Sequence, residues 1–412
     1  MDMPEKNADT IDGSGYPLAF KVAQGTARPG VLGAAAAREI FVTEARALTT
    51  YQKEAVVAEG PAGSRWRMTT DEGKHIKGSD LAPFPLGFFN AALHADLSNR
   101  LLAIAAARGI ALDDLSIRLH NFYFLDGSFT RGDAIGRSEP AKITVRIKSS
   151  ASAADARALV DAAVAASPAL DAMRRPLTNT FAIYVNGRRR VVTTLPNSDA
   201  PDATDPYMTY AKPPAPLAGA DGLPDLIEKT GEVEQGDLID ASDGSIRKVV
   251  RTVTGESRLL DPAGVTATDT WLELPGVSHF TLKSDERTAI GGGPGVNGGD
   301  QGPSGLALLS AGIVFCYMTQ ITRYIENQHF NIRGVRLVQY TPYTLTGSAA
   351  DGTLTGIVEP VDTHLFLSGG ASDEDHERLM TIAAKTCYLH ATLADTLVPQ
   401  VAVELNGTRL PD

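Results

Sequence analysis

Two stretches of this chain repeat one another, and the repeat constrains the fold more than any other feature of the 412 residues. Residue n of the first half matches residue n + 220 of the second half through a long run without gaps. The matches include turn residues and apolar residues alike, such as Tyr123, Leu125, Gly127 and Ser128 with Tyr343, Leu345, Gly347 and Ser348. Further upstream the offset is 214, since Asp71-Glu72 matches Asp285-Glu286, so the second copy carries six extra residues. A register held over roughly a hundred residues predicts two copies of one structural unit.

Changes in composition mark the boundaries of the copies. We expect an N-terminal arm over residues 1–37, a first copy over 38–190, a linker over 191–245 and a second copy over 246–412. The linker is rich in Pro, Asp, Ala and Gly, which is typical of surface loops. We expect one short helix in it near Leu223–Lys229, and we expect the arm to be loosely held.

The hydrophobic pattern predicts an α+β fold with the order β-β-β-α-β-β-α-β in each copy. Alternating apolar residues and β-branched side chains indicate the strands. Long apolar helices are expected over residues 86–108 and 306–328. The second of these helices is apolar nearly all round over its first half, which is typical of a helix buried in a core.

Charge and composition exclude several classes of partner. The net charge of -11 argues against a general affinity for nucleic acid or anionic membranes, which attract basic surfaces. The polar, acidic N-terminus is unlike a signal peptide, and no stretch approaches the ~18 apolar residues of a membrane span. We therefore expect a cytoplasmic protein. The histidine and cysteine spacings match no zinc motif and the glycine-rich loop over 291–302 lacks a phosphate-binding signature, so no metal or cofactor is expected.

The two cysteines lie at informative places in the predicted elements. Cys316 stands in the middle of the second long helix, and Cys387 stands at the end of the last helix, 71 residues later. Together with the element order, these positions make the chain resemble the OsmC/Ohr family, which includes organic-hydroperoxide-resistance proteins. The resemblance implies that the two copies pair within one chain. They would form an intramolecular pseudo-dimer whose long central helices are wrapped by antiparallel sheets.

The resemblance also implies a reaction. A peroxidatic thiolate, here Cys316, would attack the O–O bond of an organic hydroperoxide and become a sulfenic acid. Cys387 would then resolve it to a disulfide, and an external dithiol would supply electrons. In the family an Arg held by a Glu activates the first thiol. The acid is missing from the corresponding stretch PSGLALLSAG, and Tyr388 replaces the usual proline after the second cysteine. The candidates for the arginine are Arg287 in the loop before the helix, Arg323 on the helix, and Arg65 or Arg67 of the other copy.

The first copy lacks both thiols, because Asp96 and Ser167 stand at the matching positions. One interpretation is degeneration, with Asp96 paired to Arg100 one helical turn later and Ser167 capping or ending a helix. The other is a new polar site in which His94, Asp96 and Ser167 meet, with His120 from the next strand. Residues 94 and 96 are about 200° apart around a helix, which disfavours that arrangement.

Several alternatives stay open at this point. His390 follows Cys387 by three residues and either lowers the pKa of that thiol or is an ordinary partly exposed histidine. The cysteines are either a reactive pair or buried apolar residues. Besides a peroxidase, the scaffold suits a diverged hydrolase or lyase acting on a small apolar carbonyl or aromatic compound. It also suits a non-catalytic protein that binds an apolar ligand between the copies. In each case we expect a small apolar ligand, and association of pseudo-dimers into a homo-oligomer stays open.

Overall fold

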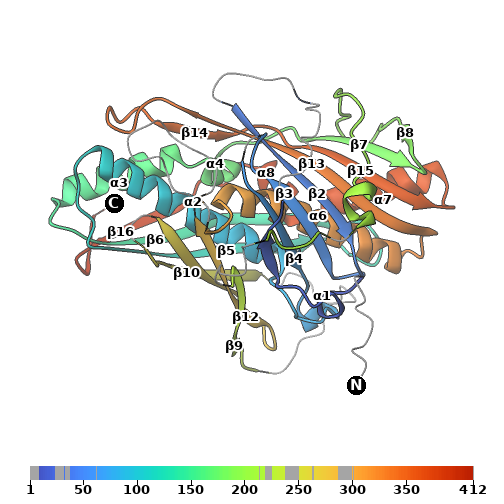
Figure 1. The fold of residues 1–412 in the computed structure, drawn as a ribbon, viewed down its shortest axis with the longest axis horizontal. Helices are drawn as coiled ribbons and strands as arrows, with labels where there is room; N and C mark the ends of the chain where they lie inside the picture. The colour runs from blue at the N-terminus through green and yellow to red at the C-terminus, as the bar shows by residue number, and fades with distance from the viewer. Residues whose placement is uncertain are drawn as a thin grey trace.

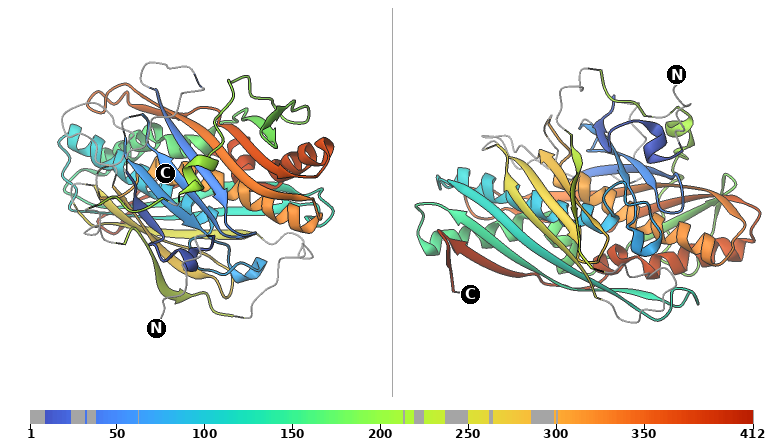
Figure 2. Two further views of the ribbon diagram at one scale, coloured as in Figure 1. Left: turned by 45° about the vertical axis from the view of Figure 1, so that its right-hand side comes forward. Right: turned by 90° about the horizontal axis from the view of Figure 1, so that it is seen from below.

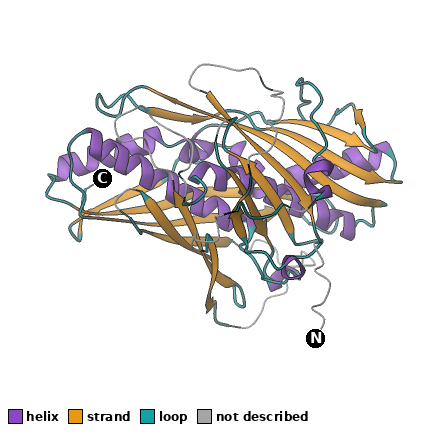
Figure 3. Ribbon diagram, in the orientation of Figure 1, coloured by secondary structure: helices purple, strands orange, loops and turns teal. Residues whose placement is uncertain are grey.

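The computed structural model describes residues 9–23, 32, 38–61, 63–212, 214–218, 225–236, 250–261, 264–285, 299 and 301–411. Two large sheets enclose a layer of helices (Figure 1). The two longest helices, α2 (Pro85–Ala107) and α6 (Gly305–Asn327), pack against each other in the middle of this layer, as Figure 3 also shows. The predicted α+β class is confirmed.

Each sheet contains strands from both copies. Within the described residues, the first sheet runs β1 (Ala19–Lys21), β4 (Arg65–Thr70), β3 (Lys53–Ala58), β2 (Arg38–Ala47), β13 (Ile332–Thr346), β15 (Asp362–Gly369), β7 (Thr180–Val185) and β8 (Arg188–Arg190), with β14 (Thr355–Val358) beside β13. The second runs β17 (Thr408–Arg409), β16 (Gln400–Leu405), β6 (Ile135–Lys148), β5 (Asp114–Asp126), β10 (Arg251–Leu259), β11 (Val265–Leu272), β12 (Ser278–Asp285) and β9 (Ile227–Val233). The strand pairs are antiparallel except β7 with β15 and β6 with β16, so each sheet is mixed rather than purely antiparallel.

The strand order intertwines the two copies. In the first sheet, the opening strands of copy 1 pair with the middle strands of copy 2 through β2 and β13. Strand β7 of copy 1 then lies beside β15 of copy 2. The second sheet repeats this arrangement with the copies exchanged, through β10 with β5 and β6 with β16 (Figure 2). Neither copy can complete its sheet alone, and the fold is therefore an intramolecular pseudo-dimer.

The repeat register reappears in the helices and strands. Shifting α2 by 220 residues gives the bounds of α6, and the same shift relates α3 (Ala153–Ala166) to α7 (Asp373–Thr386) and β7 to β16. The helix starts are alike because Ser152 and Ser372 cap α3 and α7 in the same way. Each hydroxyl accepts a hydrogen bond from the backbone N–H three residues later.

The Asn-Gly pairs at 186–187 and 406–407 form the turns into the last short strands. All four residues have positive φ, between 49° and 80°. Tight hairpin turns need this conformation, which Asn and Gly adopt most readily. Both copies therefore use the same Asn-Gly dipeptide to form the matching turn.

The arm and the linker are more ordered than expected in their described parts. Strand β1 of the arm pairs with β4, and β9 of the linker pairs with β12, so the two segments extend corresponding edges. The prediction of a helix near Leu223–Lys229 was wrong for its described part, because residues from Ile227 onward form β9. A linker helix, α5 (Tyr207–Ala211), occurs earlier instead.

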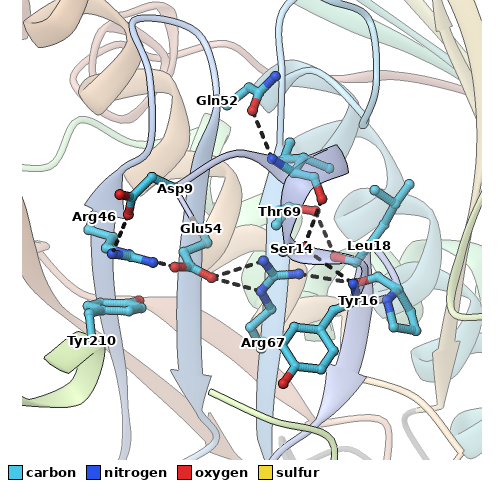
Figure 4. Close-up of polar contacts among 12 residues, drawn as sticks. Asp9, Ser14, Tyr16, Leu18, Arg46, Gln52, Glu54, Arg67, Thr69 and Tyr210 are labelled. Carbon is cyan, nitrogen blue, oxygen red and sulfur yellow. Dashed lines mark hydrogen bonds and ion pairs between the residues drawn. The ribbon is translucent and has the colours of Figure 1, made fainter. Parts of the chain in front are cut away.

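Buried polar contacts hold the arm against copy 1 (Figure 4). Glu54 accepts hydrogen bonds from Arg46 at 2.6 Å and from Arg67 at 2.9 Å. Arg67 also donates to the Pro17 carbonyl at 3.0 Å, and the Gln52 side-chain oxygen accepts from the N–H of Ile11, the first residue of α1 (Ile11–Ser14), at 2.9 Å. The expectation of a loosely held arm was therefore wrong for this part, because buried charges and amides need these partners.

The contact between α2 and α6 forms the centre of the core. Gly312 permits the close approach, because a Cβ there would lie 3.1 Å from the backbone nitrogen of Phe89. Phe88 and Phe315 pack edge to face across the helix pair, 5.2 Å between ring centroids. By length and hydropathy α6 could cross a membrane, but its apolar window is entirely buried in the protein, as expected for a core helix.

Candidate functional site

The fold brings the two cysteines together. Cys316 lies midway along α6, and Cys387 lies at the junction between α7 and α8 (Tyr388–Leu393). Their sulfur atoms are 3.3 Å apart and share a hydrogen bond. Both side chains are free thiols and almost fully buried, with 2% of Cys316 and none of Cys387 exposed. The pair is therefore close enough to form a disulfide after a small movement.

The other copy covers this thiol pair at close range. Gly136 of β6 crosses the α7–α8 junction, where a Cβ would lie 2.8 Å from the Thr386 carbonyl oxygen and 3.2 Å from the Cys387 carbonyl. The matching Gly356 crosses the junction between α3 and α4 (Pro168–Arg174) of copy 1 in the same way. The repeated glycine is thus explained by a close backbone approach that a side chain would block.

His390 lies directly beside Cys387. Its Nδ1 atom is 3.3 Å from the Cys387 sulfur, and only 5% of the residue is exposed. The ring packs against Tyr317 and Phe181, with centroids 4.9 and 5.4 Å away. Of the two alternatives for this residue, the structure rules out the exposed histidine.

The two thiols have opposite electrostatic surroundings. Burial raises the pKa of Cys316 well above its ordinary value, and its hydrogen bond with Cys387 acts in the same direction. Burial also opposes ionisation of Cys387, but the hydrogen bond with Cys316 and the adjacent His390 outweigh it and lower that pKa well below its ordinary value. Ionisation of Cys316 therefore depends on cations elsewhere around it.

A small cavity reaches Cys316 from the other direction. Its volume is about 40 Å³. It is lined by apolar and charged residues from both copies: Glu72, His75, Ile76, Phe84, Pro85, Leu86, Arg251, Leu272, Cys316, Gln320, Arg323 and Tyr388. Apolar residues and cations thus border the same thiol, in a space that holds no more than a small reactive group.

Two arginines and a glutamate supply the charges of this cavity. Arg323 donates to the Gln320 side chain at 3.4 Å and lies 4.0 Å over the Phe129 ring. Burial lowers the pKa of Arg323, and the charge of Glu72 opposes that shift. Arg251 donates to the Tyr388 hydroxyl at 2.9 Å. An Arg and a Glu thus border the first thiol, although the Glu comes from copy 1.

A buried lysine accompanies this acid. Lys53 is fully buried on β3, and its ammonium donates to the Thr50 carbonyl at 2.7 Å. Burial lowers the pKa of Lys53 to about 7, while the charge of Glu72 opposes the shift. Burial likewise raises the pKa of Glu72 to about 7, against the charges of Lys53 and Arg323. Burial therefore disfavours the charge on each of these two groups, and each charge stabilises the other.

Sequence reasoning did not identify Glu72, Lys53 or Arg251. Asp71-Glu72 was used only to set the repeat register, and Lys53 opens β3 beside Glu54, ahead of four apolar residues. Two charged residues at the start of a buried strand were the available signal, but their meaning depends on which strands of the other copy face α6. Arg287 and most of the glycine-rich loop lie outside the described residues.

At the matching place in copy 1, an ion pair replaces the thiols. Ser167 donates to an Asp96 carboxylate oxygen at 2.5 Å, and Arg100 donates to the other oxygen at 3.1 Å. The Ala169 backbone N–H also donates to Asp96, at 3.1 Å. Asp96, Ser167 and Arg100 are all fully buried. Each carboxylate oxygen is thus occupied by a partner from the protein itself.

The histidines expected near Asp96 face elsewhere. His94 lies against Ser257 of β10, 3.2 Å from its hydroxyl, and burial lowers the pKa of this imidazole to about 3. His120 lies 2.7 Å from the Thr254 hydroxyl. The proposed meeting of His94, His120, Asp96 and Ser167 in one site was therefore wrong, because the helix turns His94 toward the sheet. Among the described residues, no three His, Cys, Asp or Glu side chains are grouped to hold a metal ion.

The family-model match to known proteins falls in the half of the chain that contains both cysteines. Residues 298–401, which lie in the second copy, match the family model described as OsmC-like protein. A solved structure of an OsmC-like hydroperoxide resistance protein from Jannaschia sp. CCS1 is also similar. It is 18% identical, and the alignment covers 35% of this chain and 88% of that one, with a TM-score of 0.24. No curated protein matches the chain.

Proposed function

We propose that this protein is a thiol peroxidase that reduces organic hydroperoxides, with Cys316 as peroxidatic and Cys387 as resolving residue. The observation that carries the proposal is the pair of buried sulfurs 3.3 Å apart, one of which borders a cavity lined by cations. The OsmC-like domain over residues 298–401 supports it, since that family includes hydroperoxide resistance proteins.

The proposed chemistry has two steps. The Cys316 thiolate attacks one peroxide oxygen, the O–O bond breaks, and an alcohol leaves after taking up a proton, which yields a sulfenic acid. Cys387 then attacks the Cys316 sulfur, a disulfide forms and water leaves. An external dithiol reduces the disulfide and restores both thiols. This cycle fits a reducing compartment, and we place the protein in the cytoplasm.

Arg323 and Glu72 would serve the first step. A buried thiol ionises poorly, so Cys316 needs a nearby cation, and Arg323 borders the same cavity. Glu72 faces Arg323 from the other copy and would hold it. Because one chain supplies both halves of this site, we propose that a single pseudo-dimer is the active unit. We also propose that copy 1 is a diverged OsmC-like unit that has lost its own thiol site.

Two alternatives have less support. A hydrolase or lyase built on Asp96 and Ser167 would need those groups free, yet both are fully buried and paired with each other. A protein that binds an apolar ligand between the copies would have a cavity of about 400 Å³ there, but the charged residues Arg46, Glu326, Arg333 and Arg336 line it and neither cysteine does. The cavity at Cys316 has only about 40 Å³, far less than the ~300 Å³ at which ordinary ligand pockets begin. It suits the head of a hydroperoxide better.

Peroxide-driven disulfide formation tests the proposal. A small excess of cumene hydroperoxide should remove both free thiols of the wild-type protein, with a mass decrease of about 2 Da for the two thiol hydrogens. Cys316→Ser should abolish peroxide consumption, whereas Cys387→Ser should stop at one oxidised sulfur. Hydrogen peroxide serves as the comparison without an apolar body. Two thiols that stay free and unmodified in the wild-type protein would refute the proposal.

A further inference from the structure

The two thiols of the proposed peroxidase face different surroundings. Cys316 borders the cavity with Arg323, where a substrate can arrive. Cys387 is fully buried on the other side of the sulfur pair, and its side-chain neighbours include His390. The second thiol therefore depends on its partners to lose a proton, because burial alone opposes ionisation and its contacts with Cys316 and His390 promote it.

His390 is held so that one nitrogen meets that thiol. The aromatic rings of Phe181 from copy 1 and Tyr317 from α6 pack against the imidazole. Tyr317 is itself fixed, because its hydroxyl donates to the Met380 carbonyl at 3.2 Å. Nδ1 lies 3.3 Å from the Cys387 sulfur, while Nε2 is buried and has no hydrogen-bond partner among the described residues. The thiol is thus the polar group toward which this ring is oriented.

The repeat supplies an internal comparison. Copy 1 has Ser167 in place of Cys387, and at the place of His390 it has Leu170. Leu170 is fully buried at the corresponding helix position. The helix therefore accommodates an apolar side chain there, and the imidazole occurs in the copy that has the thiols.

We propose that His390 is the general base of the resolving step. Nδ1 takes the proton of the Cys387 thiol as that sulfur attacks the sulfenic sulfur of Cys316. The S–O bond breaks, and the same proton passes from the imidazolium to the departing hydroxide, which leaves as water. Two sulfurs have then formed a disulfide, the peroxide has supplied the oxidation, and the imidazole is again neutral. This inference rests on the proposed peroxidase function.

The test separates the two steps of the cycle. Wild-type protein, His390→Leu and His390→Asn are mixed with cumene hydroperoxide, with and without dimedone, which traps sulfenic acid. His390→Leu installs the residue that copy 1 carries, and His390→Asn keeps an amide near Nδ1 that cannot take up the proton. Both variants should consume one equivalent of peroxide within about threefold of the wild-type rate. Disulfide formation should slow on the order of 10²-fold, the usual contribution of a general base, so that trapped Cys316 sulfenic acid accumulates.

Each outcome has one meaning. Disulfide formation at the wild-type rate in either folded variant overturns the role of His390 while leaving the peroxidase proposal intact. Loss of the first step in both variants overturns it as well, since His390 would then act on Cys316. If the wild-type protein itself forms neither sulfenic acid nor disulfide, the proposed function fails. Cys387→Ser, which cannot resolve, gives the trapping level expected for a complete block.

Discussion

Replacing Asp96 by Asn should destabilise the protein strongly without affecting the thiols. Asp96 and Arg100 are both fully buried, and their side chains are 3.1 Å apart. Asparagine would keep the shape of Asp96 but leave the Arg100 cation without its counter-charge. Breaking a buried ion pair in this way costs about 3–5 kcal/mol. Taking about 2.1 cal/mol/K of unfolding entropy for each residue, a chain of 412 residues should lose roughly 3–6 °C of melting temperature.

A double variant makes this prediction specific. Gln320 stands in copy 2 at the place of Arg100, so Asp96→Asn with Arg100→Gln replaces the ion pair by two neutral amides. Differential scanning calorimetry of both single variants and the double variant should show that the double variant recovers more than half of the loss. Cys316 and Cys387 should react with peroxide as before in all three proteins. A melting temperature within about 1 °C of wild type for Asp96→Asn, together with loss of activity on any substrate, would refute the structural role and make Asp96 a catalytic residue.

Three further predictions concern other buried groups. Because burial lowers the pKa of His94 to about 3 from an ordinary value of 6.5, the unfolded chain binds its proton first. Stability should therefore fall as the pH drops below about 6.5, by up to about 1.4 kcal/mol for each pH unit, and His94→Val should flatten this slope in melting curves. Gly136→Ala should lower the free energy of unfolding by about 1–3 kcal/mol in denaturant titrations and slow disulfide formation, because the added Cβ pushes against the Cys387 junction. Gly356→Ala should lower the free energy of unfolding without changing the rate of disulfide formation. The buried Tyr123 hydroxyl has no hydrogen-bond partner among the described residues. Tyr123→Phe should therefore leave the free energy of unfolding unchanged or raise it, and a decrease above about 1 kcal/mol would show that the hydroxyl does have a partner.

The local elements of this fold were largely predictable. The two long helices, expected over 86–108 and 306–328, lie within one residue of α2 and α6 at each end. Apolar periodicity and the repeat together determine such elements, because both are properties of neighbouring residues. The linker strand β9 was missed, since its short polar sequence forms a strand only by pairing with β12.

The repeat, the two cysteines in copy 2 and their places on a long helix and at the end of the last helix can all be read from the residues alone. What surrounds the two thiols depends on how the strands and helices pack. Glu72 and Lys53 reach the second copy's thiols from the first copy, and His94 turns away from Asp96 toward β10. These contacts join residues hundreds of positions apart through strands exchanged between the copies. Spacing along the chain does not reveal them, because they depend on which strand of one copy pairs with which strand of the other.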